Sequence, residues 1–127
     1  MRCGDIASRP IATIRADATL EEAIDRLAEH DVGALLIVDR EGEPVGIITE
    51  RDVVRALAGR APLTVTVDKV GTTSGLITVS VDDPVQEAAE KMRRHGVRHL
   101  IVLDKSGRPY GIISIRDLLK VPEAVIH

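Results

Sequence analysis

A hydroxyl stands three residues ahead of a carboxylate at two places in this sequence. Thr49 precedes Asp52 in the stretch GIITERD, and Ser114 precedes Asp117 in GIISIRD. This spacing is typical of a helix N-terminus, where the two side chains cap each other's backbone N–H groups. Such a junction also offers backbone N–H groups to an anion and an oriented carboxylate to a ribose diol. Both stretches therefore predict helix starts and are candidates for binding a sugar or a phosphate.

The two stretches belong to a longer internal repeat. A shift of 65 positions (117 − 52 = 65) aligns Asp17 with Asp82 and His30 with His95, and it continues without a gap to the two Arg-Asp pairs. Capping does not explain the shared glycine, the two shared isoleucines or the shared arginine of each stretch. The sequence therefore predicts two related halves, residues 1–60 and 61–127.

Each half is predicted to fold in the order β-α-β-β-α, which makes the fold class α+β. Apolar residues recur at helical spacing after DATLEE and DDPVQE, and ALLIVD and HLIVLD are typical of buried strands. Two three-stranded half-cores would bury each other's sheets. The predicted strands are 11–15, 34–39 and 45–49 in the first half and 76–80, 99–104 and 110–114 in the second, and the final helices are 50–57 and 115–120.

Composition narrows the classes of function. The chain has 127 residues, 44% of them hydrophobic, with no Trp, no Phe and one tyrosine, so its core is aliphatic. A net charge of −3 and the scarcity of aromatic residues argue against nucleic-acid binding. Cys3 is interpreted as a reduced thiol near a loose N-terminus. No signal peptide or membrane-length apolar stretch is recognised, so a cytoplasmic location is expected.

The ordered set of motifs resembles a tandem pair of CBS domains, the regulatory modules named after cystathionine β-synthase. GIITERD, GIISIRD, GVRHLIVLD, ATLEEA and DPVQEA carry the resemblance, together with the duplication itself. The resemblance covers nearly the whole chain. It implies two β-α-β-β-α repeats packed with pseudo-twofold symmetry into one module with two clefts. It also implies an adenosine-containing ligand such as AMP, ADP, ATP or S-adenosylmethionine. No other cofactor and no metal is expected.

The resemblance assigns a role to each matching residue. Asp52 and Asp117 would accept hydrogen bonds from the ribose, with Thr49 and Ser114 near the ribose or phosphate. Isoleucines would line the base pocket, and backbone of the first strand of each repeat would read the adenine edge. The main cleft would comprise Ile47, Thr49, Asp52, Thr78, Val97, Arg98, His99 and Arg116, and the second cleft Thr13, Val32, Arg51, Ile112, Ser114 and Asp117.

The two implied clefts differ in charge. The cleft of Asp52 would receive Arg98, His99 and Arg116 from the other repeat, whereas the cleft of Asp117 faces uncharged residues and has only Arg51 as a cation. Charge-assisted bonds dominate phosphate binding, so the Asp52 cleft is the expected nucleotide site. The alternative for the Arg98-His99 pair is a solvated strand edge. His30 and His95 are assigned no binding role, because both are expected at helix C-termini.

The leading hypothesis is a regulatory module that binds an adenine nucleotide and signals to an effector protein on another chain. A structural dimerisation module without a physiological ligand is the alternative. Catalysis is not expected, because no nucleophile–base pair, metal cluster or Walker loop is recognised. A homodimer is expected through apolar helix faces around Leu57, Leu118, Leu119 and the segment DLLKVPEAVI. The sequence names neither the ligand nor the effector.

Overall fold

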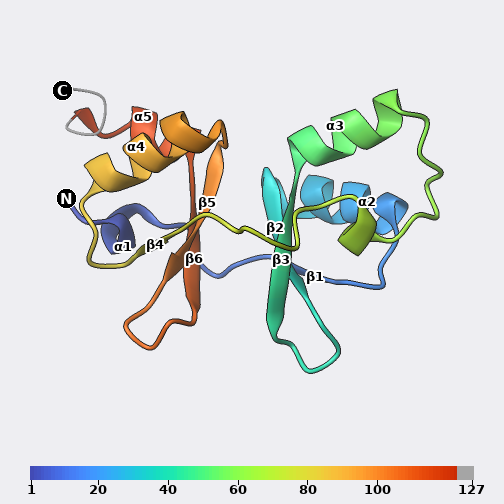
Figure 1. Cartoon of the computed structure of the whole chain (residues 1–127), viewed down its shortest axis with the longest axis horizontal. Coiled ribbons are helices and arrows are strands. Elements are labelled where there is room, and N and C mark those ends of the chain that lie inside the picture. The colour runs from blue at the N-terminus through green and yellow to red at the C-terminus, as the bar shows by residue number, and fades with distance from the viewer. Residues whose placement is uncertain (123–127) are drawn as a thin grey trace. The chain divides into compact units, whose positions relative to one another are not determined.

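The computed structural model describes residues 1–122, which form two compact units (Figure 1). The continuous unit is Ala12–Leu76, and the split unit joins Met1–Ile11 to the chain from Ile77 on. In chain order the elements are α1 (Cys3–Ile6), β1 (Thr13–Arg15), α2 (Leu20–His30), β2 (Ala34–Val38), β3 (Pro44–Thr49), α3 (Glu50–Ala58), the 3-10 helix η1 (Val67–Lys69), β4 (Thr78–Ser80), α4 (Val85–His95), β5 (His99–Leu103), β6 (Pro109–Ser114) and α5 (Ile115–Leu119).

The continuous unit has a three-stranded sheet in the order β1-β2-β3, with β1 parallel and β3 antiparallel to β2. Its core is formed by Ile14, Leu35 and Ile37 with Ile48, packed against α2 and α3, which lie on one side of the sheet in Figure 1. Alternation along the strands leaves Thr13, Leu36 and Ile47 on the opposite face.

The split unit repeats this plan with the order β4-β5-β6 and the same strand directions. Val79, Leu100, Val102 and Ile113 pack against α4 and α5 in its core. The predicted β-α-β-β-α order and the α+β class are therefore confirmed in both units, with element ends within two residues of the predicted ones.

Local turn chemistry explains why the strands pair where they do. The hairpin between β2 and β3 turns at Gly42, whose φ of 81° lies in the left-handed region that glycine adopts readily. Asp39 Oδ1 accepts the N–H groups of Glu41 and Glu43, both at 2.9 Å. The hairpin between β5 and β6 is built in the same way around Asp104 and Gly107.

The segments that precede β1 and β4 are ordered and exchanged between the units. The first segment, residues 1–11, packs in the split unit, where Cys3 is 0% exposed. The second, residues 61–76, packs in the continuous unit and buries Val67 fully. The expected loose N-terminus around Cys3 is therefore wrong: the thiol lies in the core, and burial raises its pKa from 9.0 to about 11.

Each exchanged segment lies along the outer edge of a sheet. Ser8 exchanges backbone hydrogen bonds with Ile112 of β6, and Thr72 exchanges them with Ile47 of β3. A Cβ added to Gly46 would lie 2.4 Å from the Thr72 carbonyl oxygen, and one added to Gly111 would lie 2.8 Å from that of Ser8. The repeated glycine is therefore required by a chain segment that passes too close for any side chain.

The apolar helix faces only partly match the prediction. Leu57 is 42% exposed and Leu119 is 66% exposed, as expected, but Leu118 is 1% exposed and belongs to the core of the split unit. Adjacent helix residues point about 100° apart, so Leu118 can face the core while Leu119 faces outward. The expected apolar segment continues past Pro122, and that part lies outside the described residues. Within residues 1–122, no helix has the length and apolarity needed to cross a membrane.

Candidate functional site

The junction between β3 and α3 holds Thr49 and Asp52 in a mutual cap. The Thr49 N–H donates to Asp52 Oδ2 at 2.9 Å, and the Thr49 hydroxyl donates to the same oxygen at 3.1 Å. In return the Asp52 N–H donates to Thr49 Oγ1 at 3.3 Å. Among the described residues nothing donates to Asp52 Oδ1, and Asp52 is half-buried. The helix start therefore orients a carboxylate that keeps one oxygen as an acceptor.

The junction between β6 and α5 has the same geometry. The Ser114 N–H donates to Asp117 Oδ2 at 2.8 Å, and the Asp117 N–H donates to Ser114 Oγ at 3.2 Å. Asp117 Oδ1, too, accepts no hydrogen bond within residues 1–122. Both predicted capping pairs are therefore confirmed as caps, and each is compatible with a further acceptor role.

A strand start lies beside each helix start. In the continuous unit Ala34 pairs with Thr49, and the Gly33 carbonyl accepts the Glu50 N–H at 3.0 Å. The two residues that flank this junction therefore carry no charge and very little side chain.

The corresponding end of the split unit is cationic. His99 pairs with Ser114, and the Arg98 carbonyl accepts the Ile115 N–H at 2.8 Å. Arg98 and Arg116 are exposed, and His99 is half-buried. The structure thus places the three predicted phosphate-binding cations at one end of the split unit, whereas the predicted cation at the matching end of the continuous unit is Arg51.

The predicted base-binding residues lie on the helix-free face of each sheet. Thr13 is in register with Leu36, and Leu36 with Ile47, so the three form a row across the β1-β2-β3 sheet. In the split unit the row is Thr78, Ile101 and Ile112. The middle side chain of each row, Leu36 or Ile101, is buried, and the two outer side chains are half-buried. An apolar purine face would therefore contact the outer residues of a row.

Two basic residues that the sequence analysis did not select hold the ends of these rows. Arg26 Nε donates to the Thr13 carbonyl oxygen at 2.8 Å, and Lys91 Nζ donates to the Thr78 carbonyl oxygen at 2.7 Å. Both basic residues lie at the same position of the repeat (91 − 26 = 65). Their shared position and charge could have identified them as a pair, although only the structure shows what they bind. These two carbonyls are therefore already bonded in the protein.

Val32 and Val97 have a structural part in their units. Each follows a helix and donates its backbone N–H to a carbonyl of that helix, Leu27 for Val32 and Met92 for Val97. Both side chains are half-buried and pack against the core of their own unit. Their proposed contact with a ligand stays a prediction.

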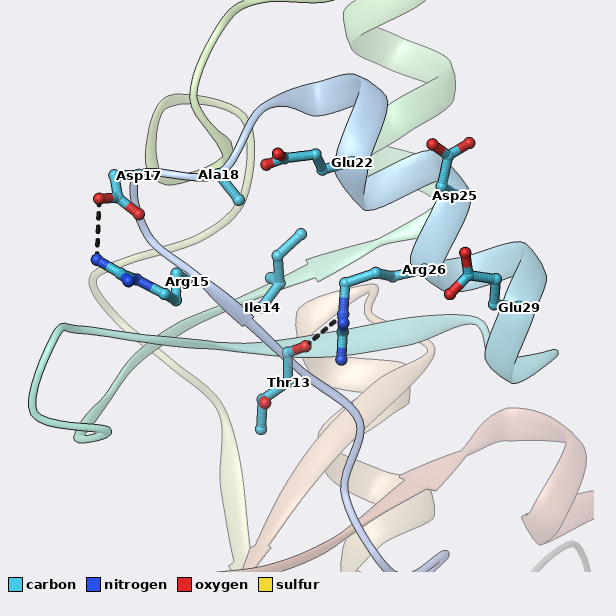
Figure 2. Close-up of a pocket in the computed structure, with 9 residues that line it drawn as sticks. All are labelled: Thr13, Ile14, Arg15, Asp17, Ala18, Glu22, Asp25, Arg26 and Glu29. Atoms are coloured by element: carbon cyan, nitrogen blue, oxygen red, sulfur yellow. Dashed lines mark hydrogen bonds and ion pairs between the residues drawn. The ribbon is translucent and has the colours of Figure 1, made fainter.

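The continuous unit also has a hollow of about 680 Å³ between β1 and α2 (Figure 2). Thr13 is the predicted site residue that lines it, and Arg26 reaches across it to the Thr13 carbonyl. Its walls carry the carboxylates of Asp17, Glu22, Asp25 and Glu29. Its acidic lining disfavours a phosphate at this place.

The duplicated junctions and the paired sheets agree with the comparison with known families. The profile of the family described as CBS domain matches the chain twice, at residues 3–59 and 67–124. The chain belongs to the CBS domain family. A 17.7 kDa protein of Acidianus ambivalens is 35% identical to this CBS pair over 94% of the chain and 71% of that protein.

Two solved structures resemble the CBS pair closely. A CBS domain protein from Pyrobaculum aerophilum complexed with AMP is 36% identical with a TM-score of 0.89, and the match covers 98% of this chain and 95% of that one. The CBS domain pair of protein MJ0100, in complex with 5-methylthioadenosine and S-adenosyl-L-methionine, is 32% identical with a TM-score of 0.86, and the match covers 95% and 94%. Both complexes contain adenosine-based ligands.

Proposed function

We propose that this CBS pair is a regulatory module that binds an adenosine-containing ligand, AMP, ADP or ATP, with S-adenosylmethionine as a further candidate. The observation that carries the proposal is the capped aspartate of each unit, whose Oδ1 stays available beside a helix N-terminus. Such an oxygen can accept both hydroxyls of a ribose. The AMP and S-adenosylmethionine complexes of the two similar structures support this ligand class.

The ligand is proposed to bind in a cleft between the two repeats, packed with pseudo-twofold symmetry as the CBS resemblance implies. In the main cleft Asp52 holds the ribose, and Arg98, His99 and Arg116 hold the phosphate. The opposite cleft, with Asp117 and Arg51, binds phosphate weakly or takes an uncharged adenosine group. The gathering of three cations in the split unit supports this inequality.

Thermal unfolding with and without ligand tests the proposal. AMP at about 100 times its dissociation constant adds about 2.7 kcal/mol to the free energy of unfolding and raises the melting temperature by roughly 5–15 °C. Titrations with ATP, S-adenosylmethionine and adenosine rank the candidates, and inosine monophosphate is the control for the base. If none of them shifts the transition, the alternative holds: a dimerisation module without a physiological ligand.

The protein acts as a homodimer in the cytoplasm, has no catalytic activity of its own and signals to an effector protein that responds to the liganded state. Aliphatic side chains at equivalent positions of α3 and α5, Val54 at 64% and Leu119 at 66% exposure, support an interface on the helix faces. Light scattering that returns twice the mass of one chain supports the dimer, and a single-chain mass at all concentrations contradicts it.

A further inference from the structure

The first exchanged segment, residues 1–11, is attached to the split unit near its start and near its end. Near its start, the Cys3 N–H donates to the Asp83 carbonyl oxygen at 2.8 Å. Near its end, Ser8 and Ile112 of β6 exchange two backbone hydrogen bonds, at 2.9 and 3.3 Å. The segment thus extends the β4-β5-β6 sheet at its outer edge through an isolated residue pair.

Contacts beside this pair fit the segment closely to β6. The Arg9 guanidinium carbon lies 3.9 Å from the centroid of the Tyr110 ring, and Arg9 Nε donates to the Tyr110 carbonyl oxygen at 3.0 Å. A Cβ added to Gly111 would lie 2.8 Å from the Ser8 carbonyl oxygen and 2.9 Å from the Ala7 Cβ. Because the fit leaves no room for a side chain at Gly111, a substitution there presses directly on the segment.

Little apolar surface holds residues 1–11 in place. Cys3 is the one buried side chain among them, and it is the only cysteine of the chain. Ile6 and Ala7 are half-buried against the core of the split unit, and Met1 is 55% exposed. Segments held by few buried apolar contacts are those that open locally while the rest of a protein stays folded.

The second exchanged segment, residues 61–76, is held by more aliphatic surface. Val67 is fully buried at the place that corresponds to Cys3 (67 − 3 = 64), and three further residues pack against the core of the continuous unit, namely Ala61, Val65 and Val70. Val65 corresponds to the exposed Met1 (65 − 1 = 64). Since a larger buried apolar area raises the free energy of opening, the first segment is expected to open at lower cost than the second.

Opening of residues 1–11 uncovers the outer edge of β6. The N–H and C=O groups of Ile112 then lose their partner Ser8, and an uncovered strand edge can pair with another extended chain. Ile112 is also a predicted ligand-binding residue of the second cleft, and its half-buried side chain lies on the helix-free face of the sheet. The segment therefore holds the backbone of a candidate site residue.

We propose that residues 1–11 form a strap that opens and closes over β6 while both sheets stay folded, and that an adenosine ligand in contact with Ile112 holds the strap closed. The second part rests on the proposed function. A ligand that binds the closed form better shifts the population toward that form by its difference in affinity for the two forms. Occupancy of the site beside Ile112 is thereby converted into a covered or an uncovered strand edge.

The reactivity of Cys3 tests the opening in the whole chain. Because the Cys3 side chain is 0% exposed, its thiol reacts with an aromatic disulfide reagent only after an opening. The reaction rate divided by that of the urea-unfolded protein gives the opening constant. At low urea this constant should hardly change with urea and should exceed the global unfolding constant, measured by circular dichroism, by about tenfold or more. A constant that equals the global one and has its full urea dependence overturns the strap.

A matched pair of glycine variants sharpens this test. Gly111→Ala raises the opening constant about five- to a hundredfold, because the added Cβ displaces Ser8 and Ala7. Gly46→Ala crowds Thr72 at the equivalent place in the continuous unit and leaves the labelling of Cys3 at low urea unchanged. Equal acceleration in both variants would mean that Cys3 reports a general loss of stability, which overturns the strap.

Adenosine tests the coupling to the ligand. At about 100 times the weaker of its dissociation constants measured by calorimetry, a ligand that binds only the closed form slows the labelling of Cys3 about 100-fold. Asp117→Ala abolishes this slowing, because it removes the proposed ribose acceptor of the cleft that contains Ile112. Unchanged labelling in a protein that binds adenosine overturns the coupling alone. If adenosine does not bind, the coupling fails together with the proposed function, and the urea series still decides whether the strap opens.

Discussion

The continuous unit and the split unit have the same backbone arrangement and differ in the side chains at equivalent positions. Both have the same strand order, the same capped start of the final helix and a glycine at the same crowded position. At the β2 start the continuous unit has Gly33 and Ala34, whereas at the β5 start the split unit has Arg98 and His99. The residues of the strand–helix junctions are duplicated, whereas the residues at the starts of β2 and β5 differ. The two units therefore have the same architecture and differ in charge at this end of the sheet.

The largest expected effect is the loss of AMP affinity when the cationic end of the split unit is removed. Replacing Arg98 and His99 together by alanine should weaken AMP by about 3 kcal/mol or more, roughly a hundredfold, because two charge-assisted bonds to phosphate are lost. Adenosine, which has no phosphate, should lose less than about threefold. Isothermal titration calorimetry measures both. A different result would contradict this assignment: the double variant keeps its AMP affinity, and Asp117→Ala abolishes tight binding. The nucleotide site would then be the cleft of Asp117, and Arg51 would be the candidate for binding the phosphate.

The next largest effect is expected when the aspartate of one unit is replaced, and the aspartate of the other unit provides the comparison. Asp52→Ala should weaken AMP and adenosine by about 1.5–3 kcal/mol, or ten- to a hundredfold, because the ribose loses a charged acceptor. Asp117→Ala is the matched control, since it removes the same cap from the other unit. Both variants should lose about 1 kcal/mol of stability. Equal affinity in a folded Asp52→Ala protein would show that this carboxylate is a cap and nothing more.

A third prediction concerns the edge that each exchanged segment covers. Gly46→Ala should lower the free energy of unfolding by about 1–3 kcal/mol, because its Cβ would lie 2.4 Å from the Thr72 carbonyl oxygen. Gly111→Ala should cost less, since the nearest atom is 2.8 Å away. Gly59→Ala, with nothing closer than 3.5 Å, is the control and should be neutral. Urea denaturation gives all three values, and equal costs for Gly46 and Gly59 would contradict the close passage.

The smallest expected effect is a pH dependence of stability that arises from Cys3 in the split unit. Burial raises the pKa of Cys3 to about 11, so between pH 9 and 11 the unfolded thiol loses its proton while the folded one keeps it. Stability should therefore fall as pH rises through this range, by at most about 1.4 kcal/mol per unit. Cys3→Val copies the residue that occupies the matching place in the continuous unit, Val67, and removes the thiol. The difference between the denaturation midpoints of the two proteins at pH 8 and pH 10.5 isolates this contribution, and a constant difference would refute it.

Local signals explain how much of the fold could be predicted. The caps at Thr49 and Ser114 and the turns at Asp39 and Asp104 join residues within four positions, so their geometry can be read from short stretches. Burial within α5 was harder, because one apolar residue of an adjacent pair had to face the core and the pattern did not say which.

The exchanged segments could not be predicted, because their partners are far away in the sequence. Ser8 binds Ile112, and Thr72 binds a residue of the preceding strand. The repeated glycine was the single trace of these contacts, and a sequence does not reveal which segment crowds it. The ligand roles of Arg98, Asp52 and the other site residues stay predictions. These roles depend on residues from both repeats and on a bound ligand.

The split unit has a consequence for synthesis on the ribosome. Residues 12–76 can fold as soon as they have emerged, since every strand and helix of their unit is then present. Residues 1–11 emerge first, yet Ser8 meets its partner strand only when Ile112 has been made. At about 5–20 residues per second this segment, with the apolar side chain of Cys3, waits unpaired for roughly 5–20 seconds. Residues 1–11 are therefore exposed to misassembly until β6 has been made, and pairing with β6 ends that exposure.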